Sequence, residues 1–230
     1  MEKNKNTSAG VGGKTLGLIH TSATLVPVFD ELCKKYLPGV KVFNIVDDSL
    51  IKNTIACGEL TPQTSKRVVN YAHSAEEAGA NYIMFTCSSI GPAVETAATL
   101  AGVPVLRVDQ PMADKAVASG TKIGVVATLS TTLEPTSDLV RRRAIVAGKN
   151  IELIPRLCEG AFEALMGGDA QKHDDIVGAA LKQLSQEVDV VLLAQASMAR
   201  VVGTLSEADK KVPILASPPL AMEYLSEVLK

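Results

Sequence analysis

The chain contains one pattern of segments twice, and this repeat is the feature that most constrains its fold. KTLGLIHTSAT at 14–24 is echoed by KIGVVATLSTT at 122–132, ANYIMFTCSSI at 80–90 by VDVVLLAQASM at 188–198, and GVPVLRV at 102–108 by KVPILAS at 211–217. The equivalent pairs Gly17 and Gly124, Cys87 and Gln195, and Pro104 and Pro213 lie 107, 108 and 109 residues apart. A shared order at a nearly constant spacing indicates an internal duplication. We therefore expect a first half over 14–110 and a second half over 120–230, preceded by a flexible leader over 1–13.

Each half reads as strands alternating with helices. The expected strands are short runs of Val, Ile and Leu without polar alternation, at 16–20, 41–46, 82–86, 103–108, 123–128, 151–154, 190–194 and 212–215. The segments 24–37, 61–79 and 172–188 have apolar residues at helical spacing, and Thr24 and Thr61 are candidate N-caps for the first two. This alternation predicts an α/β fold of two pseudo-symmetric doubly wound parallel-sheet halves, with the site in the cleft between them. The C-terminal helix could cross over to the first half.

Composition narrows the kinds of ligand. The net charge is −2, only 3% of the residues are aromatic, and there is no Trp, so neither a basic footprint nor stacking platforms for nucleic acid are present. The sequence has no apolar run long enough to span a bilayer. Four cysteines without paired spacing and three scattered histidines predict free thiols and no metal site. We expect a cytoplasmic protein with a small-molecule ligand and without a nucleic-acid or membrane partner. A homo-oligomer is compatible with the sequence, which does not fix the number of subunits.

Cys87 is the leading candidate for chemistry, because it follows the strand 82–86 where a helix is expected to begin. Ligands of open parallel sheets bind beyond the carboxyl ends of the strands. Unpaired N–H groups and the helix dipole at such a position favour a thiolate, which predicts a lowered pKa for Cys87. The alternative is a cysteine that serves only as a small buried hydrophobe. Cys33, Cys57 and Cys158 are expected to be bystanders, although Cys158 also follows a strand.

The paired halves, the strand-end Cys-Ser-Ser at 87–89, the segments VPV and VPI, and the turn ATLSTT resemble the aspartate/glutamate/hydantoin racemase superfamily from Lys14 onward. The resemblance implies an enzyme without cofactors that acts at the carbon α to a carboxylate. It also implies two cysteines, one from each half, which remove and return a proton on opposite faces of that carbon. The superfamily also includes arylmalonate decarboxylase and maleate isomerase, so the fold does not fix the reaction.

The chain departs from that pattern at the second cysteine. The equivalent position holds Gln195, whose carboxamide does not exchange protons near neutral pH but can hydrogen-bond a carboxylate or an enolate. Racemisation or epimerisation is the first reading, and a decarboxylase, isomerase or lyase with a single cysteine is the second. A carboxylate-binding protein without catalysis is a third. His20, at the end of the first strand, is a candidate second acid or partner of Cys87, or a residue that only hydrogen-bonds its surroundings.

The remaining predicted site residues carry groups that suit a carboxylate. The catalytic pair is Cys87 and His20. The predicted substrate-binding residues are Thr21, Ser88, Ser89, Thr128, Ser130, Thr131, Thr132, Gln195 and Ser197. Hydroxyl and N–H groups at strand-to-helix turns can hold such an anion, and they can also serve only as helix caps.

Overall fold

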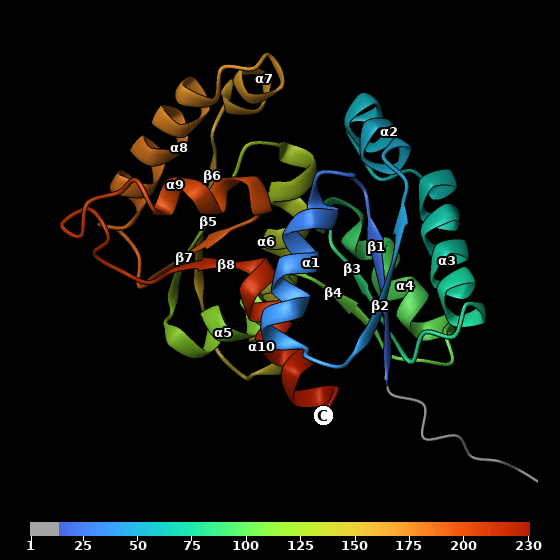
Figure 1. Ribbon diagram of the computed structural model, residues 1–230. Coiled ribbons are helices and arrows are strands. Elements are labelled where there is room, and N and C mark those ends of the chain that lie inside the picture. The colour runs from blue at the N-terminus through green and yellow to red at the C-terminus, as the bar shows by residue number, and fades with distance from the viewer. Residues whose placement is uncertain (1–13) are drawn as a thin grey trace, which may run out of the picture.

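The computed structural model describes residues 14–230, so the expected leader over 1–13 lies outside the described residues. The chain forms two four-stranded parallel sheets (Figure 1). The first has the order β2-β1-β3-β4, from Thr15–His20 (β1), Lys41–Val46 (β2), Tyr82–Phe85 (β3) and Val105–Arg107 (β4). The second has the order β6-β5-β7-β8, from Lys122–Ala127 (β5), Glu152–Leu157 (β6), Val190–Leu193 (β7) and Ile214–Ala216 (β8). The matching strand orders confirm the predicted α/β fold of two pseudo-symmetric halves.

Helices cover both faces of the first sheet because its strands are apolar on both sides. Leu16 and Leu18 of β1 pack with α1 (Leu25–Tyr36) and α10 (Ser217–Val228) on one face. Ile19 points to the other face, toward α2 (Ser49–Cys57), α3 (Pro62–Glu77) and α4 (Gly91–Leu100). This alternation along one strand places the sheet between two hydrophobic layers.

The second sheet is covered in the same way. Val125 of β5 packs with α5 (Gln110–Ser119) and α6 (Ser130–Val146). The next residue, Val126, faces the cluster formed with α7 (Ala161–Met166), α8 (Ala170–Leu184) and α9 (Ala199–Val202). The two sheets therefore have equivalent layers built from equivalent segments.

The two halves exchange their last helices. Helix α5 follows β4 of the first half but packs on the second sheet, through Met112 and Ala116. Helix α10 follows β8 of the second half but packs on the first sheet, through Met222 and Leu225. Figure 1 shows α10 between α1 and α5, close to the middle of the molecule. Because each half completes the core of the other, the cleft between them is held by buried apolar contacts.

The duplicated glycines allow neighbouring side chains to lie close to the first strand of each half. A Cβ atom at Gly124 would lie 2.6 Å from Cδ2 of Leu184 on α8. At Gly17 the nearest atom would be Cζ of Phe43, at 3.1 Å. Glycine in these two strands therefore leaves room for side chains that pack directly against the strand backbone.

Some local predictions were wrong. Thr61 caps α3, since its hydroxyl accepts from the N–H of Thr64 at 3.2 Å, but Thr24 makes no such bond and its Oγ1 pairs with Ser22 at 2.8 Å. The apolar runs predicted as β2 and β6 are not buried strands, because they lie at sheet edges, where every residue is exposed or half-buried. Within residues 14–230, no helix has the length and apolar character needed to cross a membrane.

Candidate active site

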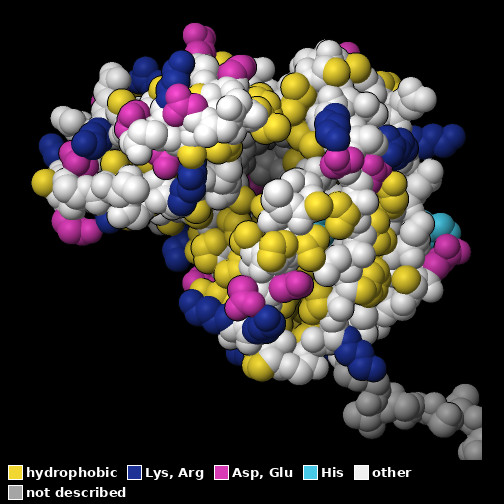
Figure 2. Space-filling model, turned by 45° about the horizontal axis from the view of Figure 1, so that its top comes forward, with side chains coloured by type: hydrophobic (Ala, Val, Ile, Leu, Met, Phe, Trp, Pro, Cys, Tyr) yellow, Lys and Arg dark blue, Asp and Glu magenta, His cyan; other side chains and the backbone are white. Residues whose placement is uncertain are grey.

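A cavity of about 350 Å³ lies between the two halves, at the carboxyl ends of the central strands. Most of its lining comes from the loops after β1, β3 and β7, from the start of α6, and from the helices α2 and α7. Figure 2 shows it as a hollow between the two lobes. This volume is at the lower end of the roughly 300–1,000 Å³ usual for small-molecule pockets. The position and size suit a small ligand.

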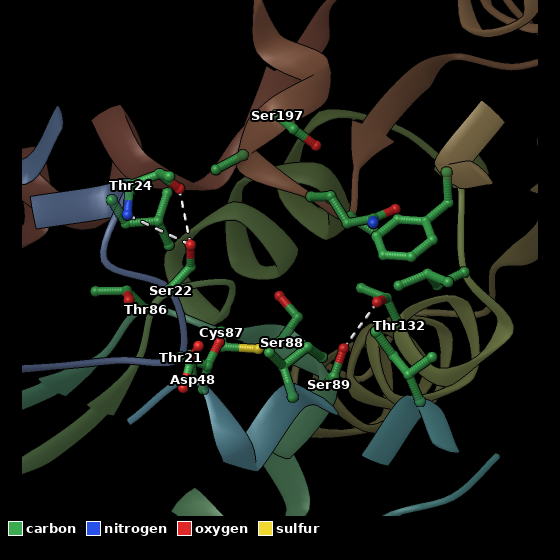
Figure 3. Close-up of a pocket in the computed structure, with 18 of the residues that line it drawn as sticks. Thr21, Ser22, Thr24, Asp48, Thr86, Cys87, Ser88, Ser89, Thr132 and Ser197 are labelled. Carbon is green, nitrogen blue, oxygen red and sulfur yellow. Dashed lines mark hydrogen bonds between the residues drawn. The ribbon is translucent and has the colours of Figure 1, made fainter. Parts of the chain in front are cut away.

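Seven of the predicted site residues line this cavity. They are Thr21, Cys87, Ser88, Ser89, Thr132, Gln195 and Ser197. Figure 3 shows Cys87, Ser88 and Ser89 along one side and Ser197 on the opposite side. The other four predicted residues, His20, Thr128, Ser130 and Thr131, are not part of the lining.

Cys87 directly precedes a short 3₁₀ helix, Ser88–Ile90, which leads into α4. Burial raises the pKa of its thiol, while hydrogen bonds from the Thr21 hydroxyl and from the N–H groups of Ser89 and Ile90 act in the opposite direction. The burial effect is the larger, so the predicted lowering of the Cys87 pKa is wrong. The sulfur is nevertheless surrounded by donors that would stabilise a thiolate.

Gln195 holds the equivalent position in the second half, directly before the 3₁₀ helix Ala196–Met198. Its Oε1 accepts from the N–H of Thr128 at 2.6 Å and from the hydroxyl of Thr128 at 3.0 Å. An N–H group can only donate, which fixes the orientation of the amide. The oxygen is therefore engaged with the second half, and the amide nitrogen is the group left to donate to a ligand.

The titratable lining residues all come from the first half. They are Asp48, Lys52 and Cys87, and Lys52 forms an ion pair with Asp48. Among the described residues, the second half contributes only hydroxyl, amide and apolar side chains to the cavity. A proton carrier is thus available on the Cys87 side of a ligand and lacking on the Gln195 side.

His20 is fully buried behind the wall of the cavity. Its Nε2 lies 2.9 Å from Oδ1 of Asn44, and its Nδ1 lies 2.9 Å from the hydroxyl of Thr86. Because the amide oxygen only accepts, Nε2 carries the hydrogen and Nδ1 accepts from Thr86. Burial lowers the pKa of His20, which keeps the ring neutral near pH 7. Only Thr86 of this set reaches the cavity.

The hydroxyl cluster at the start of α6 divides into separate roles. The hydroxyl groups of Thr132 and Ser89 lie 2.8 Å apart, so they link the two halves across the cavity edge. Thr128 positions Gln195, Ser130 is exposed, and Thr131 has a buried Oγ1 without a hydrogen-bond partner within residues 14–230. Thr132 is thus the one member of this cluster that a ligand in the cavity meets.

Sequence reasoning missed the outer walls of the cavity. Ile51 and Ile55 of α2 form one wall, and Phe162, Leu165 and Met166 of α7 form another. The helix α7 has only six residues, which is too short for a clear apolar period in the sequence. Its signal would have been Gly160, which has a positive φ of 77° directly before it.

A buried ionic network fixes the Cys87 segment to the second half. Arg107 donates to both carboxylate oxygens of the fully buried Asp109 at 3.0 and 2.8 Å, and to Glu95. Glu95 also accepts from Arg142 on α6. A Cβ at Gly91, which begins α4, would lie 2.2 Å from the Arg107 guanidinium, so this turn packs directly on the network.

The other cysteines lie away from the cavity. Cys33 and Cys158 are buried, and Cys57 is exposed at the end of α2. Among residues 14–230, no three His, Cys, Asp or Glu side chains are grouped so that they could hold a metal ion.

Comparison with known proteins agrees with the fold. A family model described as Asp/Glu/Hydantoin racemase matches residues 16–225. No match was found among curated proteins. A Yersinia pestis structure assigned as an Asp/Glu racemase has 21% identity and a TM-score of 0.73, covering 94% of this chain and 99% of that one. A glutamate racemase isoform from Bacillus anthracis has 17% identity, coverage of 94% and 81%, and a TM-score of 0.71. An allantoin racemase from Klebsiella pneumoniae has 15% identity, coverage of 94% and 87%, and a TM-score of 0.68.

Proposed function

The chain belongs to the Asp/Glu/hydantoin racemase family, and from this premise we propose that it is a cofactor-independent enzyme in which Cys87 transfers a proton at the carbon α to a carboxylate. The observation that carries the proposal is the placement of Cys87 at the cavity, beside donors from Thr21, Ser89 and Ile90 that favour its thiolate. A protein that only binds a carboxylate has no need of such a thiol.

The step requires the thiolate. The Cys87 thiolate takes the α hydrogen as a proton, and the electron pair of the C–H bond moves toward the carboxylate to give an enediolate. The carbon then takes a proton, either returned by the Cys87 thiol on the same face or supplied by water on the opposite face, and the C–H bond forms again. Thr21 and the N–H groups of Ser89 and Ile90 favour the thiolate, and the raised pKa of Cys87 makes this thiolate a stronger base once it has formed.

The substrate oxygens meet neutral donors. The hydroxyl groups of Ser88 and Thr132 and the amide nitrogen of Gln195 are available at the lining. Charge develops on the carboxylate oxygens in the enediolate, so donors fixed at these oxygens stabilise the transition state. Gln195 in this scheme holds the substrate and carries no proton.

Racemisation or epimerisation is the reaction that family membership favours. A second candidate has a specific observation behind it, since the second half contributes no titratable side chain to the lining. A reaction with proton delivery to one face, such as decarboxylation, isomerisation or lysis, needs no second acid. The two candidates share Cys87 and differ in whether the product keeps a single configuration.

Deuterium incorporation from heavy water tests the proposal. We would incubate a panel of amino, hydroxy and malonic acids with the wild type and with Cys87→Ser, and follow label at the α carbon by NMR. We expect label in at least one compound and a loss of roughly 100-fold or more in the variant, as acid/base residues usually show. Label that is equally fast in Cys87→Ser would rule out the proposed role. Chiral analysis of the labelled product distinguishes racemisation from protonation on one face.

A further inference from the structure

The cavity walls carry apolar side chains that the fold itself does not use. Ile51 and Ile55 on α2, and Phe162, Leu165 and Met166 on α7, line the cavity. None of the five belongs to the four hydrophobic clusters that form the core of residues 14–230, or packs against one of them. Met166 is 70% exposed. These side chains leave apolar surface open to whatever occupies the cavity.

The two apolar walls come from different halves. Helix α2 follows β2, and α7 follows its counterpart β6. Figure 1 shows both helices on the same side of the molecule, one on each lobe, and Figure 2 shows hydrophobic side chains beside the hollow. Most of the polar donors lie elsewhere, on the loops after β1, β3 and β7 and at Thr132 in the first turn of α6. The cavity therefore has a polar region at the strand ends and an apolar region between the two helices.

Charge in the lining is balanced. Its only charged side chains from residues 14–230 are Asp48 and Lys52, which pair with each other at 58% and 70% side-chain exposure. Lys52 already has a carboxylate partner one helix turn away, and no arginine of residues 14–230 lines the cavity. A second carboxylate placed between the apolar walls would lose its water without gaining a cation, which is unfavourable.

From these observations we infer that the substrate is a monocarboxylate whose substituent is apolar and lies between α2 and α7. The inference rests on the proposed function for the position of the reacting carbon, and it adds the class of substrate. Aspartate- or glutamate-like dicarboxylates are then poor ligands of this chain. In an apolar pocket each matched methylene contributes roughly a 10-fold or larger preference.

Protection of Cys87 from alkylation measures binding without turnover. In a Cys57→Ser background, which removes the exposed thiol, iodoacetamide labelling of Cys87 at alkaline pH would be followed by mass spectrometry. The probes are 4-methylpentanoate and succinate, which have nearly the same shape. The first carries an apolar isopropyl group where the second carries a charged carboxylate. We expect 4-methylpentanoate to protect at a concentration roughly 10-fold or more below that of succinate. Equal or better protection by succinate overturns the inference, and so does absence of protection by 4-methylpentanoate.

Two matched substitutions locate the preference. Met166→Lys places a cation in the apolar wall and should bring the two protecting concentrations together or reverse their order. Ile145→Lys is the control, because Ile145 is similarly exposed at 76% but lies outside the cavity on α6. An identical ratio in both variants would contradict the assignment of the wall. Phe162→Ala should weaken protection by 4-methylpentanoate roughly 10-fold and leave succinate unchanged.

The protection and exchange measurements separate this inference from the proposed function. If no compound shows Cys87-dependent exchange while the protection pattern holds, the proposed function fails and the specificity stands. If exchange depends on Cys87 but dicarboxylates react best, the proposed function stands and the specificity fails.

Discussion

The side-chain oxygen of Gln195 accepts two hydrogen bonds from Thr128, at 2.6 Å from the backbone nitrogen and 3.0 Å from the hydroxyl. In the first half, the hydroxyl of the equivalent threonine, Thr21, acts on the Cys87 thiol and lowers its pKa against the effect of burial. The duplicated fold thus presents one threonine to a thiol and the other to an amide. Each half therefore has a threonine that could stabilise a thiolate. Only the first half has a thiol at that place, because the second half has the amide of Gln195.

Thr21 should control the ionisation of Cys87. In Thr21→Val the hydroxyl that donates to the sulfur is lost, so the Cys87 pKa rises further and less thiolate is present near pH 7. We expect the pH profile of Cys87 alkylation to move to higher pH and proton exchange at pH 7 to fall roughly 10-fold, the equivalent of one lost hydrogen bond to a charged group. Thr99→Val serves as the control, because that hydroxyl bonds only to the backbone oxygen of Thr96 on α4. Superimposable profiles for Thr21→Val and the wild type would exclude this role.

The order of cysteine alkylation should follow exposure in the free protein. Cys57 is exposed. Burial raises the pKa of the Cys87 thiol, and it raises the pKa of Cys33 and of Cys158 to about 11. We expect iodoacetamide near pH 7 to modify Cys57 first, and Cys87 to become faster as the pH rises. Mapping of labelled peptides over time measures the order. Faster labelling of Cys87 than of Cys57 near pH 7 would mean that the donors around Cys87 outweigh its burial.

This order differs from what the sequence alone indicates, for a physical reason. The position of Cys87 at a strand end is readable from the repeat, but the sign of its pKa shift depends on how much of the surrounding chain buries it. The duplication likewise predicts both sheets and the pairing of Cys87 with Gln195. It does not reveal His20 behind Thr86, because the distance of a side chain from a cavity depends on packing. The wall formed by Phe162 stayed hidden because α7 is too short to show a period.

The network around Arg107 should be important for stability. Arg107→Met leaves the fully buried Asp109 without its cation. Removal of one partner of a buried pair typically costs about 3–5 kcal/mol. We therefore expect the free energy of unfolding to fall by about that amount, measured by urea denaturation. Arg142→Met, at a half-exposed site on the same Glu95, should cost about 1 kcal/mol or less. Similar losses in the two variants would argue against a dominant Asp109 pair.

Stability should decrease at alkaline pH because of two structural thiols. Burial raises the pKa of Cys33 and Cys158 to about 11, against about 8.5 in an unfolded chain. Between these values the folded state keeps protons that the unfolded state has released, so the free energy of unfolding is complete below about pH 8.5 and falls as the pH rises toward 11. We expect a loss of roughly 2 kcal/mol for each thiol between pH 8 and pH 10.5. Urea denaturation of the wild type and of Cys33→Ala at pH 8 and pH 10.5 gives the comparison, and an equal loss in both would contradict the assignment.

Replacing Gln195 by cysteine should give the second half a proton carrier. In Gln195→Cys the new thiol takes the position that the repeat pairs with Cys87, and the N–H and hydroxyl of Thr128 that now bind Oε1 become donors for its sulfur. Thiols on both sides of the substrate allow removal on one face and return on the other, so racemisation should appear or increase. Chiral chromatography of product from a single enantiomer in heavy water measures it.

Gln195→Ser is the matched control, because a hydroxyl of similar size is a poor proton carrier near neutral pH. If Gln195→Cys and Gln195→Ser racemise equally, the amide does not occupy the place of a second acid. If the wild type already racemises at the rate of Gln195→Cys, a group other than residue 195 supplies the second proton.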